Sequence, residues 1–301
     1  MRQPATKPLP AAFGLTMAML AVATLAKSTI PIFPEASALA VGCWVNRERR
    51  WVEKPWQIVV LVTVSSVVGV GLNHLATGLT VREILALTVV VSLLLVTGSP
   101  LSPSISAALL PVLLNIRSWF FVQAVFGLTL TVAIGAGKKS EATGRGNKFI
   151  KADVIYLLTG LAWIGISGLS HFSLLVIPPM MVVLYEWLTK PQPSTGLKLG
   201  IRQLGLLFSS ALAGSIAARL LPRLPAASGG VAVIVTIGLM YLFNTRFPPA
   251  MAISLLPLLL GDLPVWEFPL YVLIDGAVFL FIGFCAARLG LMRPPDNRAG
   301  G

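Results

Sequence analysis

The chain has 301 residues, of which 56% are hydrophobic and 11% are charged, and its mean hydropathy is +0.85. The exterior of a water-soluble domain needs far more charge than this, so a soluble globular protein is excluded and a membrane protein is indicated. The formal net charge of +12 sits in loops between apolar stretches. Such placement favours contact with acidic lipid headgroups over binding of nucleic acid.

Charge-poor apolar stretches recur along the whole chain, and most approach the roughly 20 residues that cross a hydrocarbon core of about 30 Å. They are 10–27, 57–75, 83–98, 118–136, 154–170, 172–189, 203–221, 229–244 and 268–287. We expect an all-α, polytopic transmembrane protein without a sizeable soluble domain. The first stretch resembles a signal peptide, but we interpret it as a span because the second half has an equivalent stretch at 154–170.

Basic residues gather before the first span, at 46–56, at 138–151, at 190–202 and after the last span. The positive-inside rule assigns these segments, and hence both termini, to the cytoplasm. Two cytoplasmic segments must be separated by an even number of crossings, but only three full spans lie between 46–56 and 138–151. The phrase "LSPSISAALLPVLL" at 101–114 therefore has to supply the fourth, although it rises only about 21 Å as an α-helix. By the same argument 30–45 pairs with the first span, and 247–261 makes a crossing in the second half.

This proline phrase occurs twice. Pro103 and Pro111 superpose on Pro249 and Pro257 at a single offset of 146 residues. We predict two parallel internal repeats, each of four full helices plus short Pro-interrupted segments, which is an architecture common in transporters. The predicted parts are a first membrane repeat at 8–137, a basic cytoplasmic linker at 138–152 and a second membrane repeat at 153–290.

The prolines indicate where a substrate would bind. Proline has no N–H and clashes with the preceding turn, so these short segments cannot be unbroken regular helices. In hydrocarbon, the unpaired backbone groups are tolerated only where other helices or a water-filled cavity satisfy them. The alternative is that each proline merely kinks a packing helix. Matching short segments in two halves predict a shared central site at the bilayer midplane.

The phrase "FPPAMAISLLPLL" also resembles the signature of the HPP family of integral membrane proteins, which begins His-Pro-Pro and ends Ala-Leu-Leu-Pro. Phe247, Pro248 and Pro249 take the first three signature positions here, and "EASALAV" and Lys54-Pro55-Trp56 resemble further family stretches. The likeness covers most of the first half and, in the second half, the region around 240–260. Neither copy has the histidine, so no role of that side chain carries over. The resemblance implies a transporter of small solutes, and some members are associated with nitrite transport.

Three charged residues are candidates for the site. Asp275 lies seven residues into its span, where a carboxylate is costly unless it is paired or hydrated. Arg246 precedes Pro248 and Pro249, where a guanidinium can meet an anion beside helix-start amides. Glu35 is a candidate proton carrier if it is buried. The alternatives are a structural salt bridge for Asp275, membrane anchoring for Arg246, and a water-facing helix start for Glu35.

Serine hydroxyls of the short phrases are further candidates, because they can coordinate a substrate or free backbone groups. The alternative is that they bond within their own helix. These residues are Ser102, Ser104, Ser106 and Ser254. Three asparagines near span ends, Asn73, Asn115 and Asn244, are interpreted as helix caps.

No enzyme is expected, because nucleophile and phosphate-loop motifs are absent. Two isolated cysteines, Cys43 and Cys285, make no metal pattern, and no metal or cofactor is expected. We expect a transporter or channel-like carrier of a small solute, with a small inorganic anion such as nitrite as the candidate, in the cell membrane of a bacterium. The alternative is a non-transporting membrane scaffold or sensor. The expected partners are membrane lipid and the solute, without nucleic acid; a homo-oligomer is left open.

Overall fold

The computed structural model describes residues 9–137, 150–170, 176–189, 196–261 and 264–289, and all regular structure in these ranges is helical. The expected all-α class is confirmed. The helices are α1 (Leu9–Leu25), α2 (Pro34–Ala40), the π-helix η1 (Val41–Val45), α3 (Arg49–Val52), α4 (Pro55–Leu72), α5 (Leu79–Thr97), α6 (Pro103–Leu113), α7 (Trp119–Ala136), α8 (Ile150–Ser170), α9 (Pro178–Thr189), α10 (Gly196–Leu220), α11 (Pro225–Leu242), α12 (Pro249–Leu255), α13 (Pro257–Leu260) and α14 (Glu267–Arg288).

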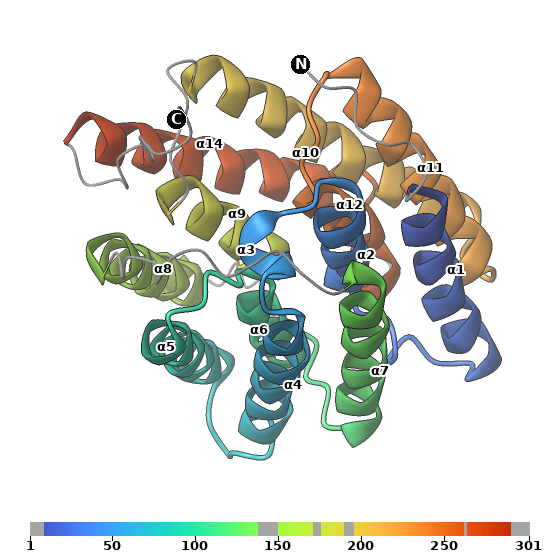
Figure 1. Cartoon of the computed structure of the whole chain (residues 1–301), viewed down its shortest axis with the longest axis horizontal. Coiled ribbons are helices and arrows are strands. Elements are labelled where there is room, and N and C mark those ends of the chain that lie inside the picture. The colour runs from blue at the N-terminus through green and yellow to red at the C-terminus, as the bar shows by residue number, and fades with distance from the viewer. Residues whose placement is uncertain (1–8, 138–149, 171–175, 190–195, 262–263, 290–301) are drawn as a thin grey trace.

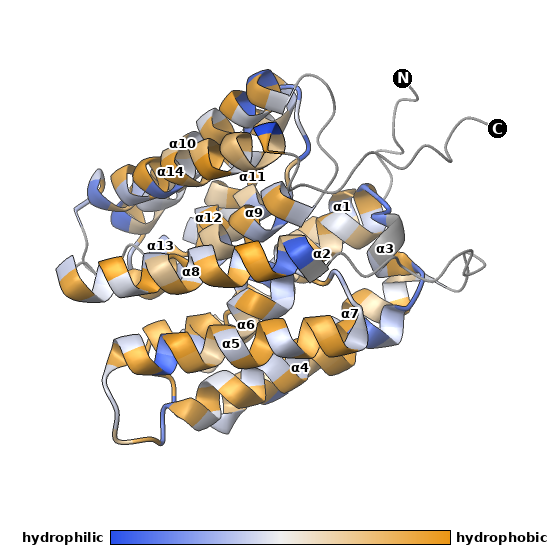
Figure 2. Cartoon of the chain, turned by 90° about the vertical axis from the view of Figure 1, so that its left-hand side faces the viewer, coloured by the Kyte–Doolittle hydropathy of each residue, from blue (hydrophilic) through white to orange (hydrophobic). Residues whose placement is uncertain are grey.

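Among the described residues, seven helices are long and apolar enough to cross a membrane: α4, α5, α7, α8, α10, α11 and α14. The shortest of them has 18 residues, which is about 27 Å of α-helix. Only 28% to 39% of each apolar window is buried inside the protein, so each of these helices leaves apolar surface exposed on the outside of the molecule. Figure 2 shows hydrophobic residues along most of α5 and α8. A surface of this kind is suited to hydrocarbon, and α1, with 17 residues, belongs to the same outer set.

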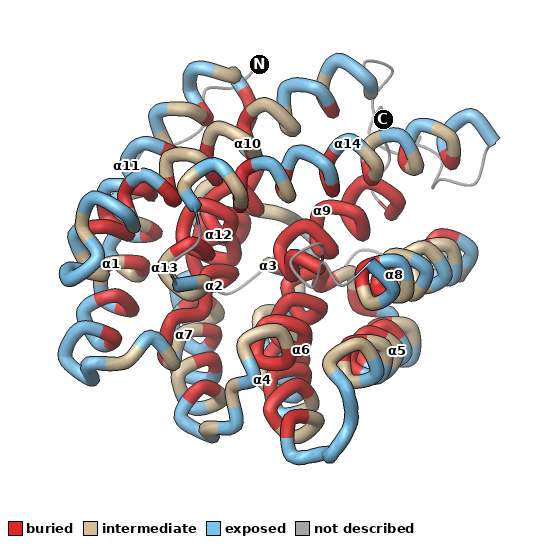
Figure 3. The backbone as a smooth tube through the Cα atoms, turned by 180° about the vertical axis from the view of Figure 1, so that it is seen from behind, coloured by how far each residue is buried: buried red, intermediate tan, exposed pale blue. Residues whose placement is uncertain are grey.

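Short helices form the centre of the molecule (Figure 3). Every residue of α2, α9 and α12 is buried, as is α6 from Pro103 to Val112. Helices that are apolar on all sides are expected in such a position. Each of the four begins at a proline, whose fixed φ suits a first helical turn and whose missing N–H has no partner to lose there.

The two halves, α1 to α7 and α8 to α14, contain a similar order of long and short helices. Corresponding helices also have corresponding neighbours, since α2 packs on α12 while α9 packs on α6. The first helix of each half crosses to the other half, because α1 packs on α11 and α8 packs on α5. That the halves arose by duplication stays a prediction. The expected linker lies largely outside the described residues, and α8 begins at Ile150, inside it.

The helix ends gather at two faces of the molecule. The start of α1 and the ends of η1 and α7 meet where Ala11, Cys43 and Gly135 line a common pocket. We call this the linker face, because the chain leaves α7 there. At the far face the end of α4 meets α5, and Arg82 donates a hydrogen bond to Asn73 over 2.8 Å.

The short helices span only part of the distance between the linker face and the far face. Phe33, just before α2, donates its backbone N–H to Met19 Sδ over 3.3 Å, so α2 begins halfway along α1. From there α2 and η1 run to the linker face. Helix α6 starts in the centre and ends at the far face, where Asn73 bonds the carbonyl of Pro111. An extended stretch and a short helix thus cover the distance that one long helix covers elsewhere.

Candidate functional site

Four short helices start around one buried pocket at the centre of the protein. Its lining includes residues from the beginnings of α2, α6, α9 and α12, namely Glu35, Pro103, Pro179, Pro248 and Pro249. A helix start carries a partial positive charge, so four of them create a region of positive potential. Proline at these starts removes N–H donors, so the side chains that line the pocket supply much of its hydrogen-bonding capacity.

Glu35, the second residue of α2, is the carboxylate closest to a helix start in this pocket. Its side chain is 2% exposed, and Oε1 accepts a hydrogen bond from the hydroxyl of Ser106 in α6. The other oxygen, Oε2, has no hydrogen-bond partner in the described part of the chain. A buried carboxyl group with an unused oxygen is costly, although the start of α2 offsets part of the cost of a negative charge. This burial excludes the water-facing alternative, and the role of Glu35 as a proton carrier stays a prediction.

A second carboxylate, Glu186 of α9, lines the same pocket and was missed in the sequence. It is 3% exposed, and its Oε1 accepts a hydrogen bond from Ser102 Oγ over 3.1 Å. Ser102 and Ser106 are one helical turn apart, so the start of α6 holds both carboxylates. A charge inside the apolar run "MMVVLYEWLT" was the available signal, but the nearby Lys190 made it look like the end of a span.

The other serines differ from these two. Ser104 is buried, and its hydroxyl has no hydrogen-bond partner among the described residues. Ser254 donates to the carbonyl of Met251 in its own helix over 2.9 Å, which is the local alternative considered for it. The two predicted prolines, Pro248 and Pro249, both line the pocket.

The remaining two charged candidates are not part of this pocket. Arg246 is exposed and lines a separate groove with Asn46 and Tyr241 near the linker face, which agrees with its anchoring alternative. Asp275 is fully buried in α14, where it faces the indole of Trp163. The structure therefore does not bring these two candidates to the central pocket. Arg246 was a candidate because it precedes Pro248 and Pro249, and Asp275 because it lies inside a span, and neither feature determines which side chains meet in the folded protein.

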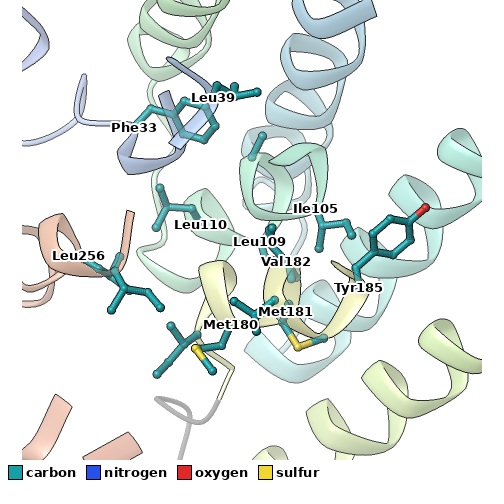
Figure 4. Close-up of a cluster of buried hydrophobic side chains, with 14 of the residues drawn as sticks. Phe33, Leu39, Ile105, Leu109, Leu110, Met180, Met181, Val182, Tyr185 and Leu256 are labelled. Atoms are coloured by element: carbon teal, nitrogen blue, oxygen red, sulfur yellow. The ribbon is translucent and has the colours of Figure 1, made fainter. Parts of the chain in front are cut away.

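The pocket is closed in this conformation. Its volume is about 10 Å³, which is at the lower limit for one water molecule. Trp51 of α3 covers it toward the linker face. Toward the other side, the short helices pack through a buried apolar cluster that includes Phe33, Leu110, Met180 and Leu256 (Figure 4). As it stands, the pocket has no room for a solute larger than one water molecule.

Comparison with protein families gives a match to the model described as "HPP, transmembrane region" over residues 204–294. The resemblance seen in the sequence is confirmed for the second half, where the match extends well beyond the 240–260 region, while the likeness in the first half stays a prediction. Within it, Phe247 takes the position of the signature histidine and stacks on Trp187, with ring centroids 6.5 Å apart. Neither the curated proteins nor the solved structures give a match. The chain thus resembles the HPP family over residues 204–294, and its several long apolar helices make it a multi-pass membrane protein.

Proposed function

We propose that this multi-pass membrane protein, which resembles the HPP family, is a transporter or channel-like carrier of a small solute, and that the solute is a small inorganic anion such as nitrite. The observation that carries the proposal is the central pocket, in which Pro-bearing helix starts from both halves surround the buried carboxyl group of Glu35. Broken helices and ionisable groups at the centre of a membrane protein are characteristic of substrate sites.

A non-transporting scaffold explains this centre less well. Long apolar helices alone would pack into a stable bundle, without buried carboxylates and without interrupted helices. Burying Glu35 and Glu186 in the protein interior costs folding free energy, and a scaffold gains no function from that cost. The scaffold remains the reference against which transport is tested.

The pocket chemistry supports an anion that travels with a proton. Helix starts attract negative charge, whereas a second negative charge on Glu35 would repel it. With a proton on Glu35, the carboxylic acid can donate a hydrogen bond to the anion, and Ser106 remains in contact with the other oxygen. The anion and the proton then cross together as a neutral pair, which lowers the electrostatic cost of the hydrocarbon region.

Uptake of labelled nitrite into proteoliposomes tests this proposal, with an inward proton gradient and with empty liposomes as the baseline. We expect uptake by the wild-type protein and its loss in Glu35→Gln, which keeps the shape of the side chain but cannot carry the proton. Asp275→Asn is the matched control, because it makes the same chemical change at a buried carboxylate outside the pocket. We expect this control to retain uptake.

Two results would overturn the proposal. Absence of nitrite uptake above the empty-liposome baseline, together with absence of nitrate and formate uptake, would favour the scaffold. Uptake that Glu35→Gln leaves unchanged would remove the central carboxyl group from the mechanism. Size-exclusion profiles of the detergent-purified variants would show whether each is folded before its uptake is interpreted.

A further inference from the structure

The far-face end of α6 is held by a network of side chains from three helices. Asn73, at the end of α4, donates to the carbonyls of Pro111 and Ile116 over 2.7 and 2.8 Å. Arg82 of α5 donates to Asn73 Oδ1 over 2.8 Å and to Asn115 Oδ1 over 3.0 Å. These bonds close the space between α4, α5 and the end of α6 in the first half.

The second half has the same helices in the same relation, which gives a residue-by-residue comparison. A Cβ at Gly69 would overlap the carbonyl of Ala108, and a Cβ at Gly214 would overlap the carbonyl of Ser254. Thus α4 corresponds to α10 at an offset of 145, while α6 corresponds to α12 at 146. The pattern of buried residues along α5 also repeats along α11 at an offset of 146 residues, from Ala86 and Ala232 onward.

With these offsets, none of the three network side chains has a counterpart in the second half. Asn73 corresponds to Ala218, Arg82 to Ser228 and Asn115 to Gly261. Asn115 and Gly261 both have positive φ, at 50° and 72°, so the chain turns in a related way without the asparagine side chain.

A cavity occupies the space where the second half lacks these side chains. Its volume is about 260 Å³, and its walls include Ser215, Ala218, Arg219, Pro257 and Gly261. The hydroxyl of Ser215 is buried, with the residue 7% exposed, and has no hydrogen-bond partner in the described part of the chain. Arg219, one helical turn further along α10, is exposed and lines the same cavity.

We propose that this far-face cavity is a binding site for a small inorganic oxyanion, occupied before or after the central pocket. The guanidinium of Arg219 offers paired N–H donors to a planar oxyanion, and the unpartnered hydroxyl of Ser215 adds a further donor. The volume admits nitrite or nitrate with several waters, since a water molecule takes about 30 Å³ in the liquid. The inference rests on the proposed function for its choice of ligand, but the site is defined by its own residues.

Binding can be measured apart from transport. The melting temperature of the detergent-purified protein is titrated with sodium nitrite and sodium nitrate, with sodium gluconate as the ionic-strength control. We expect a saturable rise, and at least a tenfold weaker apparent affinity in Arg219→Gln. Arg219→Lys should retain part of the affinity, and Ser215→Ala should weaken it. Arg223→Gln should bind as the wild type does, because Arg223 is also exposed beside α10 but does not line the cavity.

A further variant restores one side chain of the first-half network. Ala218→Asn places an asparagine beside Arg219, where Asn73 stands in the first half, and we expect it to narrow the cavity and weaken the nitrite effect while the protein stays folded. The same titrations in Asp275→Asn should show unchanged binding, because that residue lines neither the far-face cavity nor the central pocket. Retained uptake with binding that is insensitive to Arg219 would refute the far-face site alone. Arg219-dependent binding without any uptake would instead refute transport.

Lipid is the other source of an oxyanion at this face. Titration with short-chain phosphatidylglycerol, compared with short-chain phosphatidylcholine, distinguishes it from the free ion. If phosphatidylglycerol raises the melting temperature in an Arg219-dependent way while nitrite and nitrate do not, the cavity is a headgroup site and the proposal is wrong.

Discussion

The indole of Trp51 in α3 packs so closely on Gly42 in η1 that a Cβ at residue 42 would overlap its six-membered ring. The same indole lines the central pocket and donates its Nε1–H to the carbonyl of Pro100 over 3.4 Å. Residue 42 must therefore be a glycine if Trp51 is to hold the position in which it covers the pocket toward the linker face.

Gly42→Ala should displace Trp51 and open the pocket to the linker face. The measurement is the labelling rate of Ala38→Cys, a pocket residue, by a charged thiol reagent in a background with both native cysteines changed to serine. We expect labelling several-fold faster with Gly42→Ala than without it. Gly14→Ala is the control, since no atom lies near its added Cβ. Equal rates in all three proteins would show that Trp51 does not close this route.

Gly69→Ala should destabilise the protein, because the added methyl group overlaps the backbone of α6, which cannot move away from α4 without disturbing the core. Overpacking of this kind costs about 1 to 3 kcal/mol. Gly71→Ala, in the same helix, meets nothing within 4 Å and should leave the melting temperature unchanged or slightly raised. Equal melting temperatures for the two variants would contradict the close packing of α4 on α6.

Asn73→Ala should lower the melting temperature, because the carbonyls of Pro111 and Ile116 lose a donor and Arg82 loses an acceptor. Each buried group left without a partner costs about 1 to 3 kcal/mol. Asn73→Asp keeps the acceptor for Arg82 but loses both donors, so it separates the two contributions. Thr131→Ala is the control, since Thr131 is exposed and bonds only within its own helix. If Asn73→Ala melts at the same temperature as this control, the hydrogen bonds of Asn73 do not stabilise the end of α6.

The orientation in the membrane is predicted by the basic segments. A reporter fused after Lys148 or Arg298 should report a cytoplasmic position, and one inserted after Ala76, between α4 and α5, should report the opposite side. If the reporters show the reverse of both positions, the whole molecule is inserted in the opposite orientation. It would leave the helix packing unchanged and place the far-face cavity on the cytoplasmic side.

Hydropathy located the long helices because their composition is set by lipid, but it misplaced some ends. Helix α5 begins at Leu79, before the expected 83, since Arg82 finds partners in Asn73 and Asn115. Helix α10 begins at Gly196 and carries Lys198 and Arg202 in its first turns, where the chain can extend beyond hydrocarbon. Charge therefore marks the edge of the apolar region and not the end of the helix.

The site was predicted only in part. The prolines, Glu35, Ser102 and Ser106 could be found because their residue types are unusual in a membrane segment. Their pairing could not, because Glu35 and Ser106 are 71 residues apart and meet only through the packing of α2 beside α6. Glu186 was missed because buried and lipid-facing helices have the same apolar composition, so the sequence alone did not reveal that α9 is buried on all sides.

The crossing of α1 to α11 has a consequence for biosynthesis. Helix α1 is made long before its long-helix neighbour α11, which begins only at Pro225. Until then the side of α1 that meets α11, with Met17 and Leu20, lacks this part of its final environment. The insertion machinery or surrounding lipid must hold α1 through most of translation. A chain ending after α7 would keep all the helices of the first half and still leave α1 without its long-helix partner.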